Sequence, residues 1–441
     1  MHVTASPHSQ AGREALSIYE SVLRAVKADA LMERAVSLQG DTLRIGEVRA
    51  DLTRVRRTWV VGAGKASAVM AQSLEAVLGD RIAGGVVVTK HGHRVPTRRI
   101  EILEAGHPVP DEASVAAGRA IANVAQQMSA GDLALVLISG GASALMELPA
   151  DDVGLADIQT ATDLLLRCGA TIDDLNSVRA RISRLKAGGL ARMLAPARVV
   201  CLVMSDVLGN PLGVIGSGPC WTDSDAMPDA RQVIERHGLA GRMPAGVMAR
   251  VEAASRKADA PDERAEVTHV IIGDIHTALD AAVEASRSRG HRPAILTSAM
   301  RGEAREIARL IAGMTRDLPA TQEANGLDCL LLGGEPTVTV LGNGMGGRCQ
   351  ELACAAAPYL DGVEGVALLA AGTDGTDGPT DAAGALVDGS TQRRIAELGG
   401  DIGDALARSD TYHLLDAAEC LIRSGPTGSN VGDVVIALLS S

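Results

Sequence analysis

The sequence contains no phenylalanine, two tryptophans and three tyrosines among its 441 residues. Proteins that bind single-stranded nucleic acid commonly stack bases on aromatic rings, so this scarcity argues against such a partner. The formal net charge of −12 argues the same way, because an acidic surface repels nucleic acid and anionic membranes. We therefore expect neither a nucleic-acid nor a membrane partner. A phosphorylated small ligand stays open, since a few basic groups can dominate one cleft.

Long apolar runs and paired cysteines are also missing. No run approaches the roughly 18 residues that a membrane-spanning helix needs, and residues 1–12 lack the apolar segment of a secretion signal. The seven cysteines are odd in number and scattered, without a CxxC pair. We interpret them as reduced thiols rather than a disulfide framework. The sequence predicts a soluble, cytoplasmic protein.

Glycine is abundant, with 49 residues, and most of them lie in short turns. A unit of apolar run, glycine turn and helical stretch recurs, with apolar runs at residues 59–61, 133–138, 199–204, 329–332 and 366–369. Runs that are apolar throughout indicate strands buried on both faces, which is typical of parallel strands covered by helices. We predict an α/β fold of two doubly wound, mostly parallel-sheet domains with an active-site cleft between them.

The length supports two domains, because a single core usually stops growing below this size. A charged stretch with Pro261 at residues 254–267 is the best candidate for a linker. A solvated helix end or a long surface loop is the alternative. We place the domains at residues 1–260 and 261–441.

Two turns in the first half follow buried strands and open helices. In Gly62-Ala63-Gly64-Lys65 the backbone N–H groups and the helix dipole can bind an anion, and Lys65 adds a positive charge. The turn half-resembles a dinucleotide fingerprint, but Ser67 replaces the third glycine. The next strand ends in Thr89-Lys90-His91, without the acid that would bind ribose hydroxyls. This pattern argues against a nicotinamide cofactor.

The segment Ser139-Gly140-Gly141-Ala142-Ser143 is a second strand-to-helix turn suited to an anion. It lacks the Gly-x-Ser-x-Gly elbow of acyl hydrolases, so a serine nucleophile is not expected. Asp206 follows another buried strand. A lone aspartate in that position more commonly forms a turn or caps a helix than acts in catalysis.

In the second half, glycine turns carry charged residues. Gly333-Gly334-Glu335 follows one strand, and Gly346-Gly347 precedes Arg348 at the start of a helix. A guanidinium at such a place suits phosphate or carboxylate, although most single arginines are surface charges.

The twelve residues 370–381 are the most informative in the chain. Three aspartates, Asp374, Asp377 and Asp381, alternate with threonines and glycines after a buried strand. Carboxylates bind Mg²⁺, and glycines let phosphate approach the backbone. The same residue types also build ordinary surface turns. Because charged glycine turns recur at other strand ends, we favour a metal–phosphate site.

Together these segments resemble the ATP-dependent D-glycerate 2-kinase family, over roughly residues 15–439. The resemblance rests on the turns at residues 62–66, 107–111, 139–145, 205–207, 333–335, 346–348, 372–381 and 425–431. It implies a Rossmann-like domain at residues 1–260 and a MOFRL-type domain at residues 261–441.

The resemblance implies phosphoryl transfer from ATP, with Mg²⁺, to the 2-hydroxyl of D-glycerate. It associates Lys65, Arg348 and Asp374 with catalysis and Asp206 with a further acidic position. We assign Mg²⁺ to Asp374 and Asp377. The residues expected to bind the nucleotide are Gly62, Gly64, Ser139, Gly140, Gly141, Ser143, Gly334, Glu335, Gly346 and Gly347.

Two alternatives stay open. An NAD(P)H-dependent hydroxypyruvate reductase uses the same class of substrate, and a non-catalytic module would bind the ligands without turnover. A homodimer is one option for the assembly.

Overall fold

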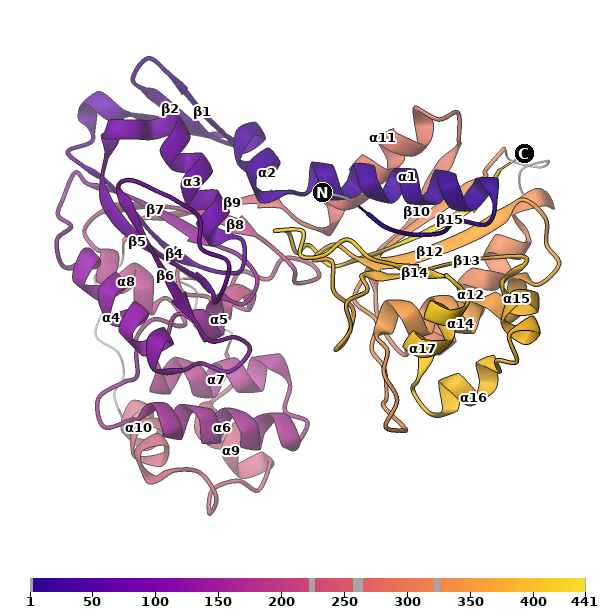
Figure 1. The fold of residues 1–441 in the computed structure, drawn as a ribbon. Coiled ribbons are helices and arrows are strands. Elements are labelled where there is room, and N and C mark those ends of the chain that lie inside the picture. Colours follow the sequence, from indigo (N-terminus) through magenta and orange to yellow (C-terminus); the bar gives the residue numbers. More distant parts are fainter. Residues whose placement is uncertain (1–2, 222–226, 257–264, 321–325, 441) are drawn as a thin grey trace. The chain divides into compact units, whose positions relative to one another are not determined.

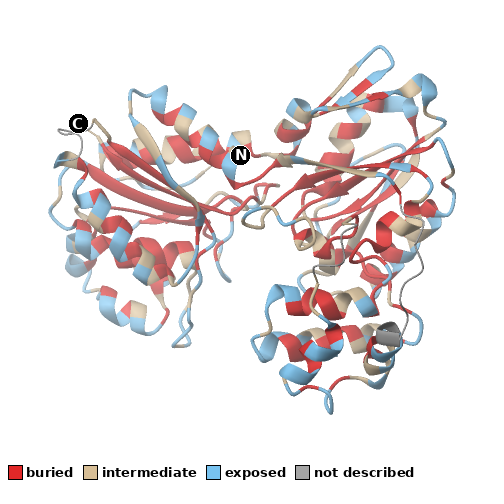
Figure 2. Ribbon diagram, turned by 180° about the vertical axis from the view of Figure 1, so that it is seen from behind, coloured by how far each residue is buried: buried red, intermediate tan, exposed pale blue. Residues whose placement is uncertain are grey.

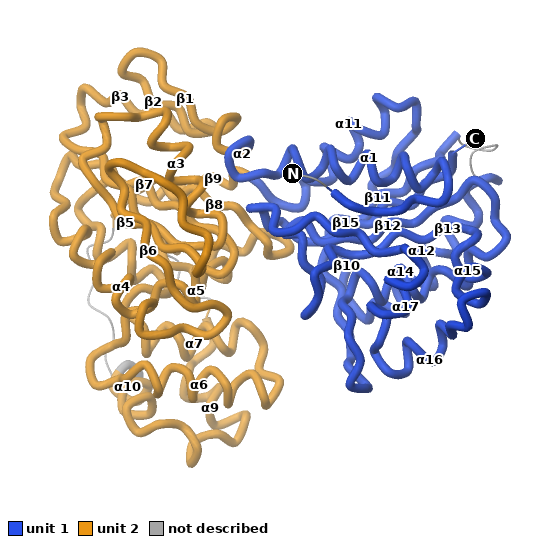
Figure 3. Tube along the Cα trace, viewed as in Figure 1, with its two compact units in different colours: residues 1–30, 273–441 blue, residues 31–272 orange. Residues whose placement is uncertain are grey.

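The computed structural model describes residues 3–221, 227–256, 265–320 and 326–440. The chain divides into two compact units, residues 1–30 with 273–441 (unit 1) and residues 31–272 (unit 2) (Figure 3). This division differs from the expected one, 1–260 and 261–441, because the N-terminal residues belong with the C-terminal part of the chain. The predicted linker falls largely on residues 257–264, which lie outside the described residues.

Unit 2 contains a six-stranded sheet in the order β6-β5-β4-β7-β8-β9. The pairs β5/β6, β4/β5, β4/β7 and β7/β8 are all parallel, as expected. The order reverses between β4 and β7, which is where doubly wound sheets bind their ligands. The strands are β4 (Thr58–Ala63), β5 (Ile82–Lys90), β6 (Ile100–Ala105), β7 (Leu133–Ile138), β8 (Arg198–Met204) and β9 (Val267–Gly273).

Helices cover this sheet, and a second group of helices has its own core (Figure 1). The covering helices are α3 (Ser67–Leu78), α4 (Glu112–Ala125), α5 (Ala142–Leu145) and α8 (Gly189–Leu194). The helical group is α6 (Leu155–Arg167), α7 (Ile172–Ile182), α9 (Ala230–Arg236) and α10 (Ala245–Arg256). A small antiparallel sheet completes the unit, with β1 (Val36–Gln39), β2 (Thr42–Ile45) and β3 (Val48–Asp51).

The sheet of unit 1 is mixed, so the prediction of a second mostly parallel sheet is wrong. Its order is β10-β11-β15-β12-β13-β14, and only the β10/β11 pair is parallel. The last long strand, β15, lies between β11 and β12 and runs antiparallel to both. The strands are β10 (Pro293–Met300), β11 (Cys329–Gly334), β12 (Val366–Gly372), β13 (Gly384–Asp388), β14 (Leu421–Ile422) and β15 (Asp433–Leu439).

The error has a clear physical origin. Every residue of β12 and β15 is buried, and Figure 2 shows the central strands of this sheet buried along their length. Helices cover both faces of the sheet, so the strands are apolar throughout whichever way they run. A continuous apolar run reports burial on two faces and does not report strand direction.

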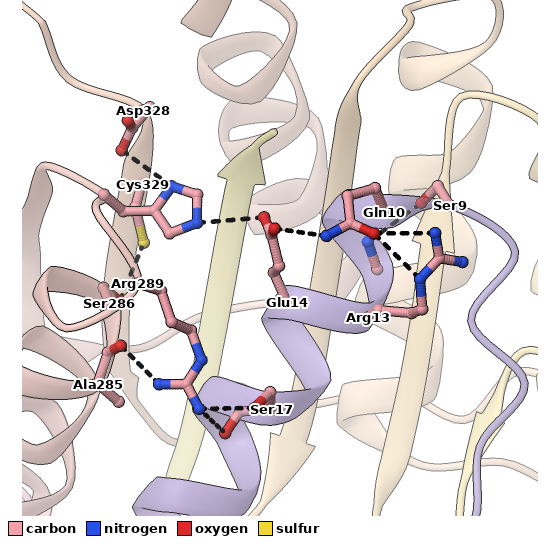
Figure 4. Close-up of polar contacts among 12 residues, drawn as sticks. Ser9, Gln10, Arg13, Glu14, Ser17, Ala285, Ser286, Arg289, Asp328 and Cys329 are labelled. Carbon is pink, nitrogen blue, oxygen red and sulfur yellow. Dashed lines mark hydrogen bonds and ion pairs between the residues drawn. The ribbon is translucent and has the colours of Figure 1, made fainter. Parts of the chain in front are cut away.

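The helices of unit 1 include one from the start of the chain. Helix α1 (Gln10–Ala25) lies beside α11 (Ile275–Arg287) over one face of the sheet (Figure 1). His291 lies 3.2 Å from Glu14 and 3.5 Å from Asp328. Arg289 donates to the Ser17 hydroxyl of α1 at 2.6 Å, and Figure 4 shows its side chain directed at Ser17. The remaining helices are α2 (Ala28–Ala35), which crosses the unit boundary, α12 (Ala304–Arg316), α14 (Arg348–Leu360), α15 (Thr391–Glu397), α16 (Ile402–Ala407) and α17 (Thr411–Ala417).

Within the described ranges, no helix has both the length and the apolarity needed to cross a membrane.

Candidate functional site

In unit 2 the turn after β4 is locked to the turn after β7. Lys65 donates its backbone N–H to the Gly140 carbonyl at 2.9 Å, and Ala66 donates to the Ser139 hydroxyl at 3.0 Å. A Cβ at Gly64, where φ is +147°, would come within 2.0 Å of the Ser139 hydroxyl oxygen. The two turns that the sequence singled out therefore meet at the point where the strand order reverses.

Several of the predicted binding residues build this junction. A Cβ at Gly62 would lie 2.1 Å from the Leu137 carbonyl oxygen, so glycine there permits the close approach of β4 and β7. The buried Ser139 hydroxyl lies 3.1 Å from that of Ser67 as well as accepting from Ala66. Direct phosphate binding by these groups stays a prediction. Gly140, Gly141 and Ser143 belong to the second turn of this junction, where the Gly140 carbonyl accepts from Lys65 and the Ser143 hydroxyl lies 2.7 Å from that of Ser217.

Basic groups gather at this edge of the sheet. Lys90 is the last residue of β5, and Lys65 and the half-buried His107 lie two residues after β4 and β6. Burial lowers the pKa of His107 to about 4, and the positive charges of Lys65 and Lys90 add to the effect. Burial, Lys90 and Lys65 also lower the pKa of His93. At neutral pH the two histidines are neutral and the two lysines supply the positive charge, which suits an anionic ligand.

Lys90 and His107 are functional candidates that sequence reasoning passed over. Lys90 ends one strand of a parallel sheet and His107 lies two residues after the next, and the carboxyl ends of such strands meet at one edge. This rule could have identified both residues from the sequence. Asp206 obeys it too, because it follows β8, which pairs in parallel with β7.

In unit 1 the central feature is the pair of Arg348 and Asp433. The Arg348 guanidinium binds Asp433 through two N–H groups, one of them at 2.9 Å from Oδ1, and Glu335 lies 3.4 Å from Nη1. Burial acts to lower the pKa of Arg348, but the hydrogen bond and charge of Asp433 outweigh it, and the pKa is raised. Arg348 is therefore a permanently charged, oriented group, with its side chain 31% exposed at the start of α14.

Asp433 was missed in the sequence. It is the first residue of β15, and in a parallel sheet that position would lie at the edge opposite to Gly334 and Gly372. Because β15 is antiparallel to its neighbours, Asp433 lies directly opposite both of those strand-end glycines. The position of Asp433 beside these glycines follows only from the direction of β15.

Asp377 caps helix α14. Its two carboxylate oxygens accept the backbone N–H groups of Cys349, at 3.1 Å, and Gln350, at 2.8 Å. A Cβ at Gly347 would come within 2.3 Å of this carboxyl group, so glycine is needed for the contact. Burial raises the pKa of Asp377 to about 6, although the two N–H groups oppose the shift. The expected metal ligand is thus a buried carboxylate directed at a helix N-terminus, where backbone dipoles favour negative charge.

Asp374 is half-buried and more exposed than Asp377. Its Oδ1 accepts from Thr376 N at 3.0 Å, and its charge acts on Asp433. The loop is tied to residues 424–432, since Thr373 donates its hydroxyl to the Gly432 carbonyl at 2.7 Å. Asp381 lies apart from this cluster, where it accepts from Tyr412 and Arg423.

The other predicted glycines permit close contacts around Arg348. A Cβ would lie 2.3 Å from the Met300 carbonyl oxygen at Gly334 and 2.4 Å from the Thr411 hydroxyl oxygen at Gly346. Among the described residues, no group of three or more His, Cys, Asp and Glu side chains is arranged to hold a metal ion. A Mg²⁺ held here would therefore need oxygens of the bound substrate or of water in addition to protein carboxylates. Mg²⁺ bound to a nucleotide is usually coordinated in that way.

An α/β fold with charged, glycine-rich strand ends defines a protein that binds small anionic ligands. Comparison with known proteins narrows that class. The model described as "Domain of unknown function (DUF4147)" matches residues 14–252, and that of the MOFRL family matches residues 328–433.

Relatives match along nearly the whole chain. A D-glycerate 2-kinase of Thermotoga maritima is 43% identical over 391 residues, which cover 87% of this chain and 91% of that protein. A glycerate 2-kinase of Pyrococcus horikoshii is 34% identical and covers 96% and 94%. The crystal structure of a glycerate kinase from T. maritima superimposes with a TM-score of 0.86 at 38% identity, covering 97% of this chain and 99% of that one. The chain belongs to the glycerate kinase family, with an N-terminal DUF4147 region and a C-terminal MOFRL region.

Proposed function

We infer that this protein is a glycerate 2-kinase, which transfers the γ-phosphoryl group of ATP to the 2-hydroxyl of D-glycerate. The observation that carries this conclusion is the 43% identity to a D-glycerate 2-kinase over 87% of the chain. The fold agrees, since a glycerate kinase structure superimposes on nearly every residue.

The charges at the strand ends suit this chemistry. Phosphoryl transfer asks for little covalent chemistry from the protein and depends on positioning and charge neutralisation. In unit 2, Lys65 is held by backbone bonds at the junction of two glycine turns, where it would bind phosphoryl or carboxylate oxygens. In unit 1, Arg348 is oriented by Asp433 and would bind the same kinds of group.

Asp374 is the carboxylate best suited to Mg²⁺ or to the proton of the substrate hydroxyl. Both oxygens of Asp377 already accept helix N–H groups, and those of Asp433 accept from Arg348. Bound Mg²⁺ would neutralise phosphate charge. One or two carboxylates are sufficient protein ligands for it.

The first prediction concerns Lys65→Ala and Asp374→Asn. Because each removes a charge proposed to act on the transferring group, we expect kcat/KM for D-glycerate phosphorylation to fall by about 10³-fold. The assay follows ADP formation, and phosphorus NMR distinguishes 2-phosphoglycerate from 3-phosphoglycerate.

Asp361→Asn is the matched control, since Asp361 is exposed just after α14. Near-normal kcat/KM in folded Lys65→Ala and Asp374→Asn would contradict the assigned roles. Oxidation of NADH by hydroxypyruvate without ATP, in the absence of any glycerate phosphorylation, would instead support the reductase alternative.

We also propose a cytoplasmic location and leave the homodimer as a prediction. Light scattering on the purified protein measures the mass in solution, which is 45.3 kDa for one chain.

A further inference from the structure

Helix α7 carries two polar side chains, Asn176 and Arg179, whose N–H donors are not satisfied by the described residues. Asn176 is 3% exposed, and its Oδ1 accepts from the Ser217 hydroxyl at 3.0 Å. Its Nδ2 has no hydrogen-bond partner in the described part of the chain. A buried amide donor without a partner costs free energy in the folded state, so such groups in folded proteins point to a missing ligand or water.

Arg179 lies three residues further along the same helix, so it shares a face with Asn176. Its guanidinium makes no hydrogen bond or ion pair within the described ranges, although the residue is half-buried. Burial lowers the pKa of Arg179 to about 10, and the charge of Glu147 offsets only part of this. A bound anion would remove that cost.

The nearby carboxylate, Glu147, is already engaged by other donors. Glu147 binds Lys186 through Oε2, while its Oε1 accepts from the Ser183 hydroxyl at 2.5 Å and from the Leu148 N–H at 2.9 Å. The Lys186–Glu147 pair is neutral as a whole. The charge of Arg179 is therefore compensated only in part.

This face reaches the second glycine turn. The Ser217 hydroxyl that donates to Asn176 also lies 2.7 Å from the Ser143 hydroxyl. Ser143 stands two residues after Gly141, where a Cβ would lie 3.4 Å from Lys65 Cγ. Hydrogen bonds thus link α7 through Ser217 to Ser143 of the second turn, and Gly141 of the same turn lies near the Lys65 side chain.

We propose that Asn176 Nδ2 and the Arg179 guanidinium form an oxyanion subsite that binds one of the two substrates of the kinase. The donors are N–H groups only, one neutral and one cationic, and that set is suited to a carboxylate or a phosphate. The inference rests on the proposed function. Both sources present the same chemistry: the carboxylate of D-glycerate and a phosphate of ATP.

The test compares Arg179→Gln and Asn176→Asp with Arg181→Gln. Asn176→Asp keeps the oxygen that accepts from Ser217 and replaces the N–H donor with a second acceptor. Arg181 is an exposed arginine of the same helix and serves as the control. Initial rates are measured with each substrate varied at saturating concentration of the other, and melting curves establish folding.

We expect the first two variants to raise the KM of one substrate by about 10-fold or more, because a charge-assisted hydrogen bond is lost. A rise for D-glycerate identifies the carboxylate, and a rise for ATP identifies a phosphate. If both variants match Arg181→Gln for both substrates, the proposal is wrong. Should Arg179→Gln fail to fold, the isosteric Asn176→Asp and the charge-retaining Arg179→Lys decide the question by the same criterion.

Calorimetric titration separates this inference from the proposed function. D-glycerate and a non-hydrolysable ATP analogue are titrated separately into each variant. Binding that is weakened in Asn176→Asp would support the subsite even if the unmodified protein showed no turnover. Unchanged binding of both ligands in an active kinase would reject the subsite and leave the kinase assignment intact.

Discussion

Arg348 and Asp433 show how two side chains depend on each other. Asp433 is 1% exposed, and Arg348 provides two of its hydrogen bonds. Removing one partner of a buried pair leaves the other charge uncompensated, which costs more than the pair itself contributes.

We therefore predict that Arg348→Ala lowers the free energy of unfolding by about 2–3 kcal/mol, the lower end reflecting the partial exposure of the arginine. The double variant Arg348→Ala/Asp433→Asn should recover most of that stability, because no buried charge is left alone. It should not recover activity, because Arg348 itself is proposed to contact substrate. Urea unfolding and the kinase assay measure the two quantities.

Arg408→Ala is the control, since Arg408 pairs with Asp404 on the surface and its side chain is 61% exposed. Such pairs contribute about 1 kcal/mol or less. If Arg348→Ala were as stable as Arg408→Ala, the buried charge of Asp433 would not depend on Arg348 for compensation. A double variant that stays unstable would show that the arginine acts through packing rather than charge.

At the scale of elements, the junction of the turns after β4 and β7 depends on Gly64. A side chain there would meet the Ser139 hydroxyl oxygen at 2.0 Å and the Ser139 backbone at 2.7 Å, and φ is +147°. We predict that Gly64→Ala lowers the free energy of unfolding by about 2 kcal/mol or more, through overpacking and backbone strain. Activity should fall more steeply, because Lys65 is the next residue.

Gly241→Ala is the matched control: a Cβ there meets nothing within 4 Å. Substitutions of this kind usually change stability by no more than about 0.5 kcal/mol. Chemical denaturation of both variants is the measurement. Equal stability of Gly64→Ala and Gly241→Ala would mean that the two turns can separate without cost.

The elements were predictable where local pattern decides them. The apolar runs at residues 133–138, 199–204 and 366–369 lie in strands, and the glycine turns after them lie at strand ends. The surroundings of Asp377, which the sequence analysis assigned to Mg²⁺, were not predictable. Its carboxylate turns to the N–H groups of Cys349 and Gln350, residues that no sequence spacing places beside it.

At the scale of the whole molecule, the first helix belongs to a sheet made from residues near the end of the chain. Tyr19 is fully buried and donates its hydroxyl to the Gly372 carbonyl at 2.6 Å, across 353 residues of sequence. Burial raises the pKa of Tyr19 well above its ordinary value, so the hydroxyl stays protonated and able to donate. The helix thus supports the strand end that carries the Asp374 loop.

We predict that Ile18→Ala, at a position that is 0% exposed, destabilises unit 1 by about 2–5 kcal/mol. Amide hydrogen exchange should quicken in β12, β13 and β15, strands that α1 contacts, and stay unchanged in β4 and β7. Arg24→Ala, an exposed change on the same helix, is the control. Faster exchange in β4 and β7 instead would contradict the assignment of α1 to unit 1.

By itself the sequence determined the α/β class, the glycine turns at buried strand ends and the charged residues Lys65, Arg348 and Asp374. These follow from periodicity and turn chemistry, which act over a few neighbouring residues. The tertiary structure alone decided the antiparallel course of β15, the place of Asp433 beside Arg348 and the packing of α1 in unit 1. Each depends on which distant segments pair, and the free energy of that pairing comes from burial shared between them rather than from either segment alone.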